Sequence, residues 1–261
     1  MSLHMLSFRP DFARLARLAV REKLLPPGGD PGYAVHAVLA ASFGELAPKP
    51  FLLLAPGETG GGPAGRLIAY SAASLETLRA RAEEFADPAF SAVLQLPEAE
   101  AKPMPERFAA GRRLGFRLRV RPVVRTGRPR DAVAAGGDVA ERTVSPESRG
   151  RERDAFLAAI EGTPPDAGPT RPVVYAEWLA GQLERGGARL ASAALDGFAF
   201  ARLMVRDRSA DASRRRFVTG PDCRLSGTLT VEDPEAFAAG LARGIGRYRS
   251  FGFGMLILTP P

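Results

Sequence analysis

Tyr33 and His36 are the residues of this chain best suited to proton transfer at neutral pH. An imidazole has an ordinary pKa of about 6.5, so it can accept or release a proton near pH 7. Asp30 and Pro31 suit the N-cap and the first position of a helix, so a helix is expected to begin there. In its first two turns the two side chains lie three positions apart on one side, where unpaired N–H groups favour anions. The pair therefore predicts acid–base chemistry beside an anionic group.

Less specific interpretations of both residues stay open. Val35, Val38 and Leu39 form the apolar stripe of the expected helix, and Tyr33 and His36 fall away from it at roughly 100° per residue. This placement argues against a core role for His36, whose alternative is an ordinary surface or capping histidine. Packing against a neighbouring helix is the alternative for Tyr33.

A glycine-rich stretch near the end of the chain is the second candidate site. Glycine lets backbone N–H groups approach a ligand, and successive N–H groups in such a loop form a concave surface suited to phosphate. Arginine adds forked donors that match phosphate oxygens. An anion-binding loop before a buried final strand is expected, although a tight turn with solvated arginines fits the same pattern. The candidate residues are Gly244, Gly246, Arg247, Arg249, Ser250, Gly252 and Gly254.

Charge indicates the kind of partner. The chain has 261 residues and a net charge of +7, and all but three of its 36 basic residues are arginines. An excess of positive charge attracts a polyanion, and nucleic acid is the most plausible one. A metabolic enzyme whose arginines only reflect the composition of its genome is the weakest alternative.

The counts of cysteine and histidine limit the chemistry. The single cysteine, Cys223, forms no disulfide within the chain, which fits a reducing, cytoplasmic location. Two histidines and one cysteine are too few for the usual ligand set of a zinc or iron site, so we expect no metal and no cofactor. The sequence shows no apolar run of 18 residues and no signal-peptide pattern, so no membrane partner is expected.

The first 114 residues alternate between strand and helix patterns. Strands are expected at Leu3–Phe8, Phe51–Ala55, Arg66–Ser71 and Ala92–Leu96. Helices are expected at Pro10–Leu24, Pro31–Phe43 and Ser74–Ala86. With one additional helix, this is the element order of a ferredoxin-like βαββαβ domain.

The rest of the chain repeats that order. The sequence therefore predicts an α+β protein with antiparallel sheets and two tandem ferredoxin-like domains, 1–114 and 115–261. Residues 126–170 are expected to be mostly loop, with one helix at Arg149–Ile160. The remaining expected helices are Val173–Arg185 and one that starts at Asp233, and the expected strands are Phe116–Pro122, Arg189–Ala194, Phe198–Val205, Cys223–Val231 and Met255–Leu258.

Two groups of arginines in the second domain are candidate contacts to a polyanion. The strand Phe116–Pro122 alternates strictly, so Arg117, Arg119 and Arg121 share one face and are expected to form an exposed cationic ridge. A solvated strand face is the alternative for this group, and a mobile charged hairpin tip is the alternative for the second. The second group is a basic linker between two later strands that holds Arg206, Arg208, Arg214, Arg215 and Arg216.

Four of these segments together resemble the CasE family, the CRISPR repeat-processing endoribonucleases of type I-E systems in the glycine-loop RAMP superfamily. They are Phe116–Pro122, Glu177–Leu179, Leu229–Pro234 and above all Gly244–Leu256, whose glycine pattern looks like the family signature. The resemblance is looser in the first half, where it rests on the first strand and on the Tyr-x-x-His of residues 33–36.

The resemblance implies an activity and a set of partners. It implies cleavage of the repeat stem-loop in CRISPR precursor RNA by an internal 2′-hydroxyl, giving a 2′,3′-cyclic phosphate and a 5′-hydroxyl without a metal. It also implies that the protein stays with the other subunits of the Cascade complex. An RNA-binding subunit of the same fold without catalytic activity is the alternative.

The resemblance also implies roles for residues. His36 matches the catalytic histidine and Tyr33 its partner, while the glycine-rich stretch and both arginine groups would contact RNA. Some family members carry a lysine later on the same helix, but Ala40 and Ala41 stand there in this chain. The arginines at 206–216 are therefore the candidates for a cationic group near the cleaved phosphate.

Overall fold

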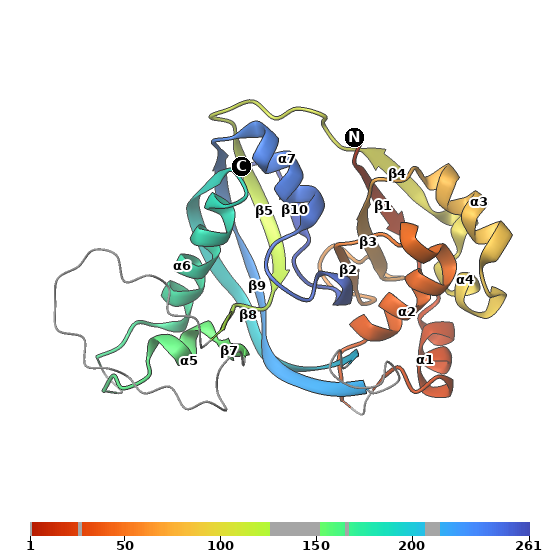
Figure 1. Cartoon of the computed structure of the whole chain (residues 1–261), viewed down its shortest axis with the longest axis horizontal. Helices are drawn as coiled ribbons and strands as arrows, with labels where there is room; N and C mark the ends of the chain where they lie inside the picture. The colour runs from red at the N-terminus through yellow and green to blue at the C-terminus, as the bar shows by residue number, and fades with distance from the viewer. Residues whose placement is uncertain (1, 26–27, 126–151, 165–166, 207–214) are drawn as a thin grey trace.

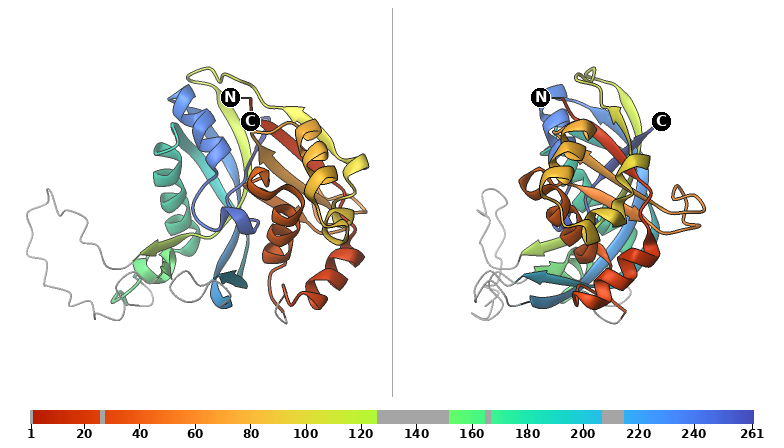
Figure 2. Two further views of the ribbon diagram at one scale, coloured as in Figure 1. Left: turned by 45° about the vertical axis from the view of Figure 1, so that its right-hand side comes forward. Right: turned by 90° about the vertical axis from the view of Figure 1, so that its right-hand side faces the viewer.

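The computed structural model describes residues 2–25, 28–125, 152–164, 167–206 and 215–261. Within these residues the strands form two four-stranded antiparallel sheets and a two-stranded ribbon (Figure 1). The first sheet belongs to the N-terminal half of the chain and the second to the C-terminal half. The two halves stand side by side (Figures 1 and 2).

The N-terminal sheet has the spatial order β2-β3-β1-β4. Leu6 and Phe8 alternate along β1 and are fully buried, and Ser74 caps α3 by accepting a hydrogen bond from the N–H of Thr77, as the sequence predicts. The strands are β1 (His4–Phe8), β2 (Phe51–Leu54), β3 (Arg66–Ser71) and β4 (Glu100–Pro103), and the helices are α1 (Phe12–Arg21), α2 (Gly32–Phe43), α3 (Leu75–Phe85) and α4 (Pro88–Leu94).

The C-terminal sheet has the order β10-β5-β9-β8. Each sheet thus places the first and third strands of its unit in the centre, which is the split βαβ arrangement. This match confirms the prediction of an α+β protein with two tandem ferredoxin-like units. The strands are β5 (Arg113–Val120), β8 (Ala188–Arg206), β9 (Arg215–Val231) and β10 (Leu256–Thr259), and the main helices are α6 (Arg171–Glu184) and α7 (Pro234–Arg243).

The strand expected at Ala92–Leu96 is wrong, because helix α4 occupies most of it. Asp87 accepts a hydrogen bond from the N–H of Ala89, and Pro88 stands at the start of the helix, which are helix-initiating features. The fourth strand is β4, whose residues are all exposed at the edge of the sheet. An exposed edge strand has no apolar alternation, so its sequence gave no strand pattern.

The helix expected at Arg149–Ile160 is also shorter than predicted. Its described part begins as strand β7 (Glu152–Asp154), which pairs with β6 (Val123–Arg125), and only then becomes helix α5 (Ala155–Ala159). Asp154 accepts a hydrogen bond from the N–H of Phe156, so the helix starts after this N-cap.

The two separate strands expected at Arg189–Ala194 and Phe198–Val205 are wrong, because one long strand replaces them, and both described ends of the expected basic linker belong to paired strands. Strand β8 is continuous and pairs with β9 from Ala188 to Arg206. Irregularities in the pairing near Ser192 and Gly197 interrupt the alternation, which explains why the sequence suggested two strands. The end of the hairpin extends past the other strands of its sheet and reaches the N-terminal half (Figures 1 and 2).

The two halves share their hydrophobic cores. Leu54 and Tyr70 of the first half pack in the cluster that includes Phe116 and Val120 of the second. Met204 of the hairpin packs in the core of the first half. The hydroxyl of Tyr70 donates a hydrogen bond of 2.8 Å to the carbonyl oxygen of Leu256.

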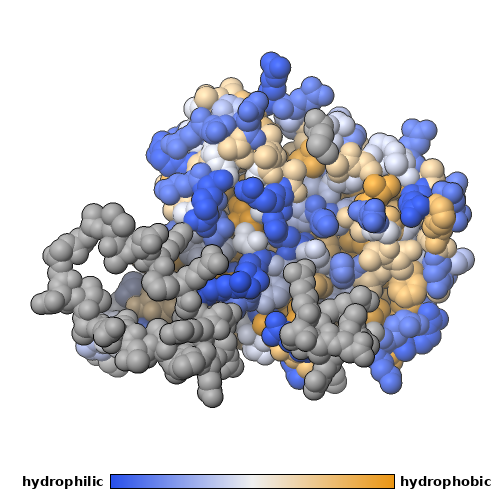
Figure 3. Space-filling view, viewed as in Figure 1, coloured by the Kyte–Doolittle hydropathy of each residue, from blue (hydrophilic) through white to orange (hydrophobic). Residues whose placement is uncertain are grey.

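The division into domains between residues 114 and 115 stays a prediction. Figure 3 shows that hydrophilic side chains are spread over the face seen in Figure 1.

Candidate functional site

Helix α2 is buried on more sides than its apolar stripe predicts. Tyr33 is only 5% exposed, so its expected place away from the core is wrong. The reason is that a second packing surface covers that side of the helix. This surface is the segment 244–255 between α7 and β10, which we call the glycine loop and which contains the short 3-10 helix η4 (Arg249–Phe251). His36, one turn later, is half-buried.

The glycine loop brings the two candidate sites of the sequence together. The ring of Phe251 stacks on Tyr33, with centroids 6.0 Å apart, and meets His36 edge to face at 5.2 Å. Tyr33 and His36 themselves are 6.2 Å apart, edge to face. Residues more than 200 positions apart in the chain thus form one aromatic cluster.

Two glycines permit this close approach. A Cβ on Gly32, at the start of α2, would collide with the carbonyl oxygen of Phe251. Gly254 has a φ of +79°, and a Cβ there would collide with the carbonyl oxygen of Ile245, so only glycine fits without strain. This geometry fits the alternative of a tight turn, and the anion-binding role of the stretch stays a prediction.

A small pocket of about 130 Å³ opens beside His36. Its walls include Ala40 of α2, Lys49 just before β2, Phe51 of β2 and Ser250 of η4. An imidazole, an ammonium group, a hydroxyl and the carboxylate of Glu45 therefore border one cavity. Lys49 was not singled out from the sequence, because a lone lysine between two elements belongs to no motif. The one sequence feature that could have pointed to Lys49 is the small number of lysines in the chain, which has three.

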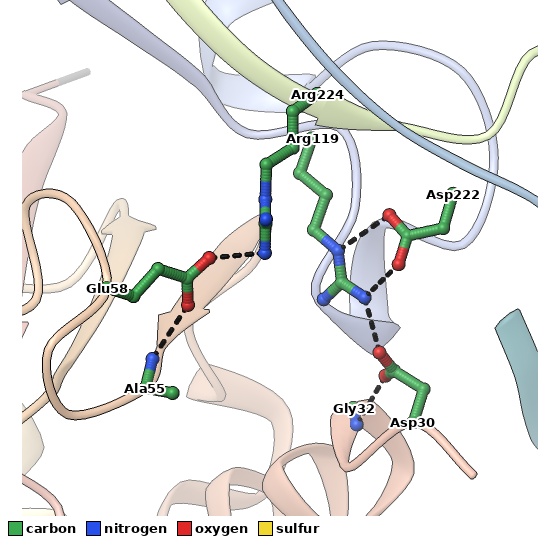
Figure 4. A network of polar contacts seen from close by, with 7 residues as sticks. All are labelled: Asp30, Gly32, Ala55, Glu58, Arg119, Asp222 and Arg224. Atoms are coloured by element: carbon green, nitrogen blue, oxygen red, sulfur yellow. Dashed lines mark hydrogen bonds and ion pairs between the residues drawn. The ribbon is translucent and has the colours of Figure 1, made fainter. Parts of the chain in front are cut away.

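The expected cationic ridge on β5 is wrong for two of its three arginines. Arg117 is exposed, as predicted. Arg119 is instead paired with Asp222 on β9 and with Asp30 at the start of α2 (Figure 4). Its Nε and Nη2 donate to the two carboxylate oxygens of Asp222 at 3.0 and 2.6 Å. The alternation of residues was correct, but the face that was expected to meet solvent meets the N-terminal half.

Asp30 links that ion pair to the start of α2. The side chains of Asp30 and Arg119 are 6% and 12% exposed, respectively. Oδ1 of Asp30 also accepts a hydrogen bond of 2.7 Å from the N–H of Gly32. Burial lowers the pKa of Arg119, but Asp222 and Asp30 raise it by more, so the guanidinium stays charged. A second pair, Arg224 with Glu58, also joins the two halves (Figure 4).

Arg121 is the most buried of the ridge arginines, at 1% exposure. Its guanidinium lies 4.9 Å from the ring centre of Tyr248 and 5.6 Å from that of Phe253. Burial lowers the pKa of this guanidinium. Arg121 therefore packs beneath the glycine loop, against two of its aromatic rings.

The arginines of the glycine loop have partners of their own. Arg247 is half-exposed and pairs with Glu152, which also accepts a hydrogen bond from the hydroxyl of Tyr248. Burial and this hydrogen bond raise the pKa of Tyr248 to about 12. Arg249 donates a hydrogen bond of 2.8 Å to the carbonyl oxygen of Arg243. Both arginines stay within reach of a ligand at the loop surface.

The predicted basic linker is only partly described. Arg206 and Arg215 lie in the paired strands β8 and β9, and Arg216 is exposed on β9. Arg208 and Arg214 lie outside the described residues. In the described residues no helix is long and apolar enough to cross a membrane, and no group of three potential metal-ligating side chains comes together there.

Several known structures share this fold. A CRISPR endoribonuclease Cse3 bound to a 19-nucleotide RNA has 20% identity and a TM-score of 0.59, with 100% of each chain covered. Cas6e from Escherichia coli K-12 has 16% identity, full coverage of both chains and a TM-score of 0.52. A chain of a pre-nicking CRISPR RNA-guided surveillance complex has 17% identity and a TM-score of 0.55, with 99% of this chain and 100% of that chain covered.

Two further comparisons concern the sequence. No curated protein matches the chain. The family model described as CRISPR associated protein matches residues 3–260, nearly the whole chain. This match confirms the CRISPR-associated kinship that the glycine signature indicated, and it shows that the chain belongs to the family of CRISPR-associated proteins.

Proposed function

We propose that this protein is an endoribonuclease that cleaves CRISPR precursor RNA at the repeat stem-loop without a metal ion. The observation that carries the proposal is the contact between the glycine loop and His36 at a shared pocket. The structures of similar fold include Cse3 bound to RNA and a chain of a surveillance complex. We therefore also propose that the protein stays with its product RNA among the subunits of such a complex, in the cytoplasm.

The chemical step needs one nucleophile and one exchange of protons. The 2′-oxygen of the RNA bonds to phosphorus while the bond from phosphorus to the 5′-oxygen breaks. The proton lost by the 2′-hydroxyl is matched by the proton that the 5′-oxygen gains. The imidazole of His36 can take up or deliver such a proton, an effect of about 10²–10⁴-fold on the rate. The products are a 2′,3′-cyclic phosphate and a 5′-hydroxyl.

Lys49 supplies a cation that the sequence had placed elsewhere. The phosphorane-like transition state carries extra negative charge on oxygen, and a fixed cation in a small pocket stabilises that charge. Lys49 borders the pocket of His36, whereas the described arginines of the 206–216 group, Arg206, Arg215 and Arg216, lie in β8 and β9. The hydroxyl of Ser250 and the loop N–H groups would hold the phosphate against these two side chains.

Tyr33 contributes through its ring in this proposal. The ring contacts both His36 and Phe251, which also contact each other, so it helps to set the position of the imidazole relative to the loop. Arg117, Arg216 and Arg247 are exposed arginines that would contact phosphates of the stem, since RNA helices are recognised mainly through shape and backbone.

The deciding experiment is a cleavage assay with a repeat stem-loop RNA in the presence of EDTA. Wild-type protein should cut the RNA once, and His36→Ala should lose about 10²–10⁴-fold in rate while it still binds the RNA. His4→Ala is the matched control, because His4 is the only other histidine, and it should cut normally. A 2′-deoxy nucleotide at the cut site should stop cleavage.

Three outcomes would contradict the proposal. Binding without cutting by the wild type would indicate an RNA-binding subunit instead. Loss of cutting in EDTA that returns with a divalent ion would contradict the metal-free step. Cutting of the 2′-deoxy RNA would mean that water, and not the 2′-hydroxyl, attacks.

A further inference from the structure

The glycine loop also borders a larger groove of about 540 Å³. This groove runs from the C-terminal end of α6 along α7 to the start of the glycine loop. Leu183, Phe237 and Leu241 form its apolar floor, and Arg185, Arg243 and Arg249 lie around it. In Figure 3 hydrophilic side chains flank apolar surface over the part of the molecule where Figure 1 shows α6 and α7 side by side. A volume of this size suits a ligand as large as one nucleotide.

The three arginines around the groove have no carboxylate partner among the described residues. Arg185 and Arg243 are exposed, and no ion pair of either is formed with the described acidic side chains. Burial, followed by the charges of Arg243 and Arg247, lowers the pKa of Arg249. Like charges that crowd around one groove are stabilised when an anion enters it.

The helix dipoles account for only part of this arrangement. Arg185 follows the last residue of α6 and Arg243 is the last residue of α7, and a positive charge at a helix C-terminus is favourable by about 0.3–1 kcal/mol. Arg249 belongs to neither helix, yet its guanidinium donates to the end of α7 and lines the same groove. A third guanidinium at this place needs another reason.

The groove and the pocket of His36 are next to each other along the chain. Arg249 lines the groove and Ser250 lines the pocket, so consecutive residues of η4 face the two cavities. We propose that the groove binds a phosphate of the single-stranded RNA that continues from the stem-loop, next to the phosphate that is cut. This inference rests on the proposed function, and it extends the substrate from the stem-loop to its flanking strand.

The experiment compares two RNAs that cannot be cut because of a 2′-deoxy nucleotide. One consists of the stem-loop alone, and the other carries single-stranded extensions on both sides. Binding of each RNA is measured by fluorescence anisotropy at several salt concentrations. The test variant is Arg185→Gln with Arg243→Gln, and the matched control is Arg17→Gln, an exposed arginine of α1.

The test variant should bind the extended RNA about tenfold more weakly, and its salt slope should fall by about 0.7 for each lost phosphate contact. Its affinity for the stem-loop alone and the behaviour of the control should stay unchanged. Arg185→Lys with Arg243→Lys should bind like the wild type, because the charge is kept. Thermal unfolding of each variant shows whether the fold is intact.

Equal weakening for both RNAs, or no weakening for either, would overturn the inference. Competition by a free nucleoside monophosphate with the same affinity as the extension would assign the groove to a mononucleotide and also overturn it. Because these are binding measurements, the groove can be confirmed even if no RNA is cut. Conversely, cleavage that depends on His36 would stand if the groove binds nothing.

Discussion

The two ferredoxin-like halves share a strand order but differ at one equivalent place, the connection between the second helix of the unit and its last strand. In the N-terminal half this connection, residues 86–99, contains helix α4 and the short turn η2 (Leu96–Glu98) and has no glycine. In the C-terminal half it is the glycine loop, which reaches across to the other half and touches α2. The N-terminal half thus supplies His36 and Lys49, while the C-terminal half supplies the loop that borders the same pocket.

The contrast extends to the ion pairs. Arg119 and Asp30 form a buried pair between the halves, whereas Arg189 and Glu232 form an exposed pair within the second half. If the stability of each half depends on the other, loss of the pair between the halves should lower the free energy of unfolding far more than loss of the pair within the second half. The following predictions test that dependence, from the largest expected effect to the smallest.

Arg119→Met should lower the free energy of unfolding by about 3–5 kcal/mol, because the buried carboxylate of Asp30 and the partly buried one of Asp222 lose their cation. Arg189→Met, where both partners are more than half exposed, should change it by about 1 kcal/mol or less. Urea denaturation of both variants measures the difference. Similar values for the two variants would show that the contact between the halves contributes little.

Lys49→Gln should lower the cleavage rate by about 10²-fold, the effect of removing one charged group that stabilises a transition state. Affinity for the stem-loop RNA should change little, since a single phosphate contact is lost. Lys102→Gln, at an exposed position of β4, is the control. Single-turnover cleavage separates rate from binding, and an unchanged rate for Lys49→Gln would return the cationic role to the hairpin arginines.

Gly32→Ala should lower cleavage by about tenfold or more, because the new Cβ displaces Phe251 and with it the wall of the pocket. Gly181→Ala is the matched control, since a Cβ there meets only the end of a flexible arginine at 3.7 Å. It should keep full activity and gain about 0.5–1 kcal/mol of stability from its position within α6. Full activity of Gly32→Ala would mean that the loop contact is not needed for cleavage.

Tyr70→Phe should cost about 1 kcal/mol in the free energy of unfolding, because the carbonyl oxygen of Leu256 loses a hydrogen bond between the halves. Cleavage should stay within about twofold of the wild type, as the phenol lies outside the pocket lining. Thermal and urea unfolding measure the first effect. A loss of activity greater than the loss of stability would place this contact in the positioning of the site.

Much of the fold followed from local patterns. Asp233 and Ser74 began helices as their capping chemistry predicts, and the apolar face of β5 is buried as its alternation requires. The failures have physical causes. The edge strand β4 has no buried face, and irregular pairing in β8 breaks its alternation.

The site was predictable only in part for a similar reason. Composition and spacing identified His36 and the glycine loop separately, and the family resemblance gave them roles. No local pattern showed that Phe251 would stack on Tyr33, that Arg119 would form an ion pair with Asp30, or that Lys49 would border the pocket. These contacts join residues far apart in sequence, so they depend on how the two halves pack.

Residues on both faces of the long hairpin of β8 and β9 make contacts that depend on strand register. Leu203 packs beside Phe253 of the glycine loop, and the next residue, Met204, packs in the core of the first half. The carbonyl oxygen of Arg202 accepts a hydrogen bond of 3.0 Å from the N–H of Asp30. From Gly197 to Arg206 the strand pairs one to one with β9, and neighbouring residues there point to opposite faces, so a single-residue insertion between Gly197 and Arg202 would exchange the two contacts and break both. Changes in length within this stretch should therefore be accepted only in steps of two, which gives variant libraries of this hairpin a simple design constraint.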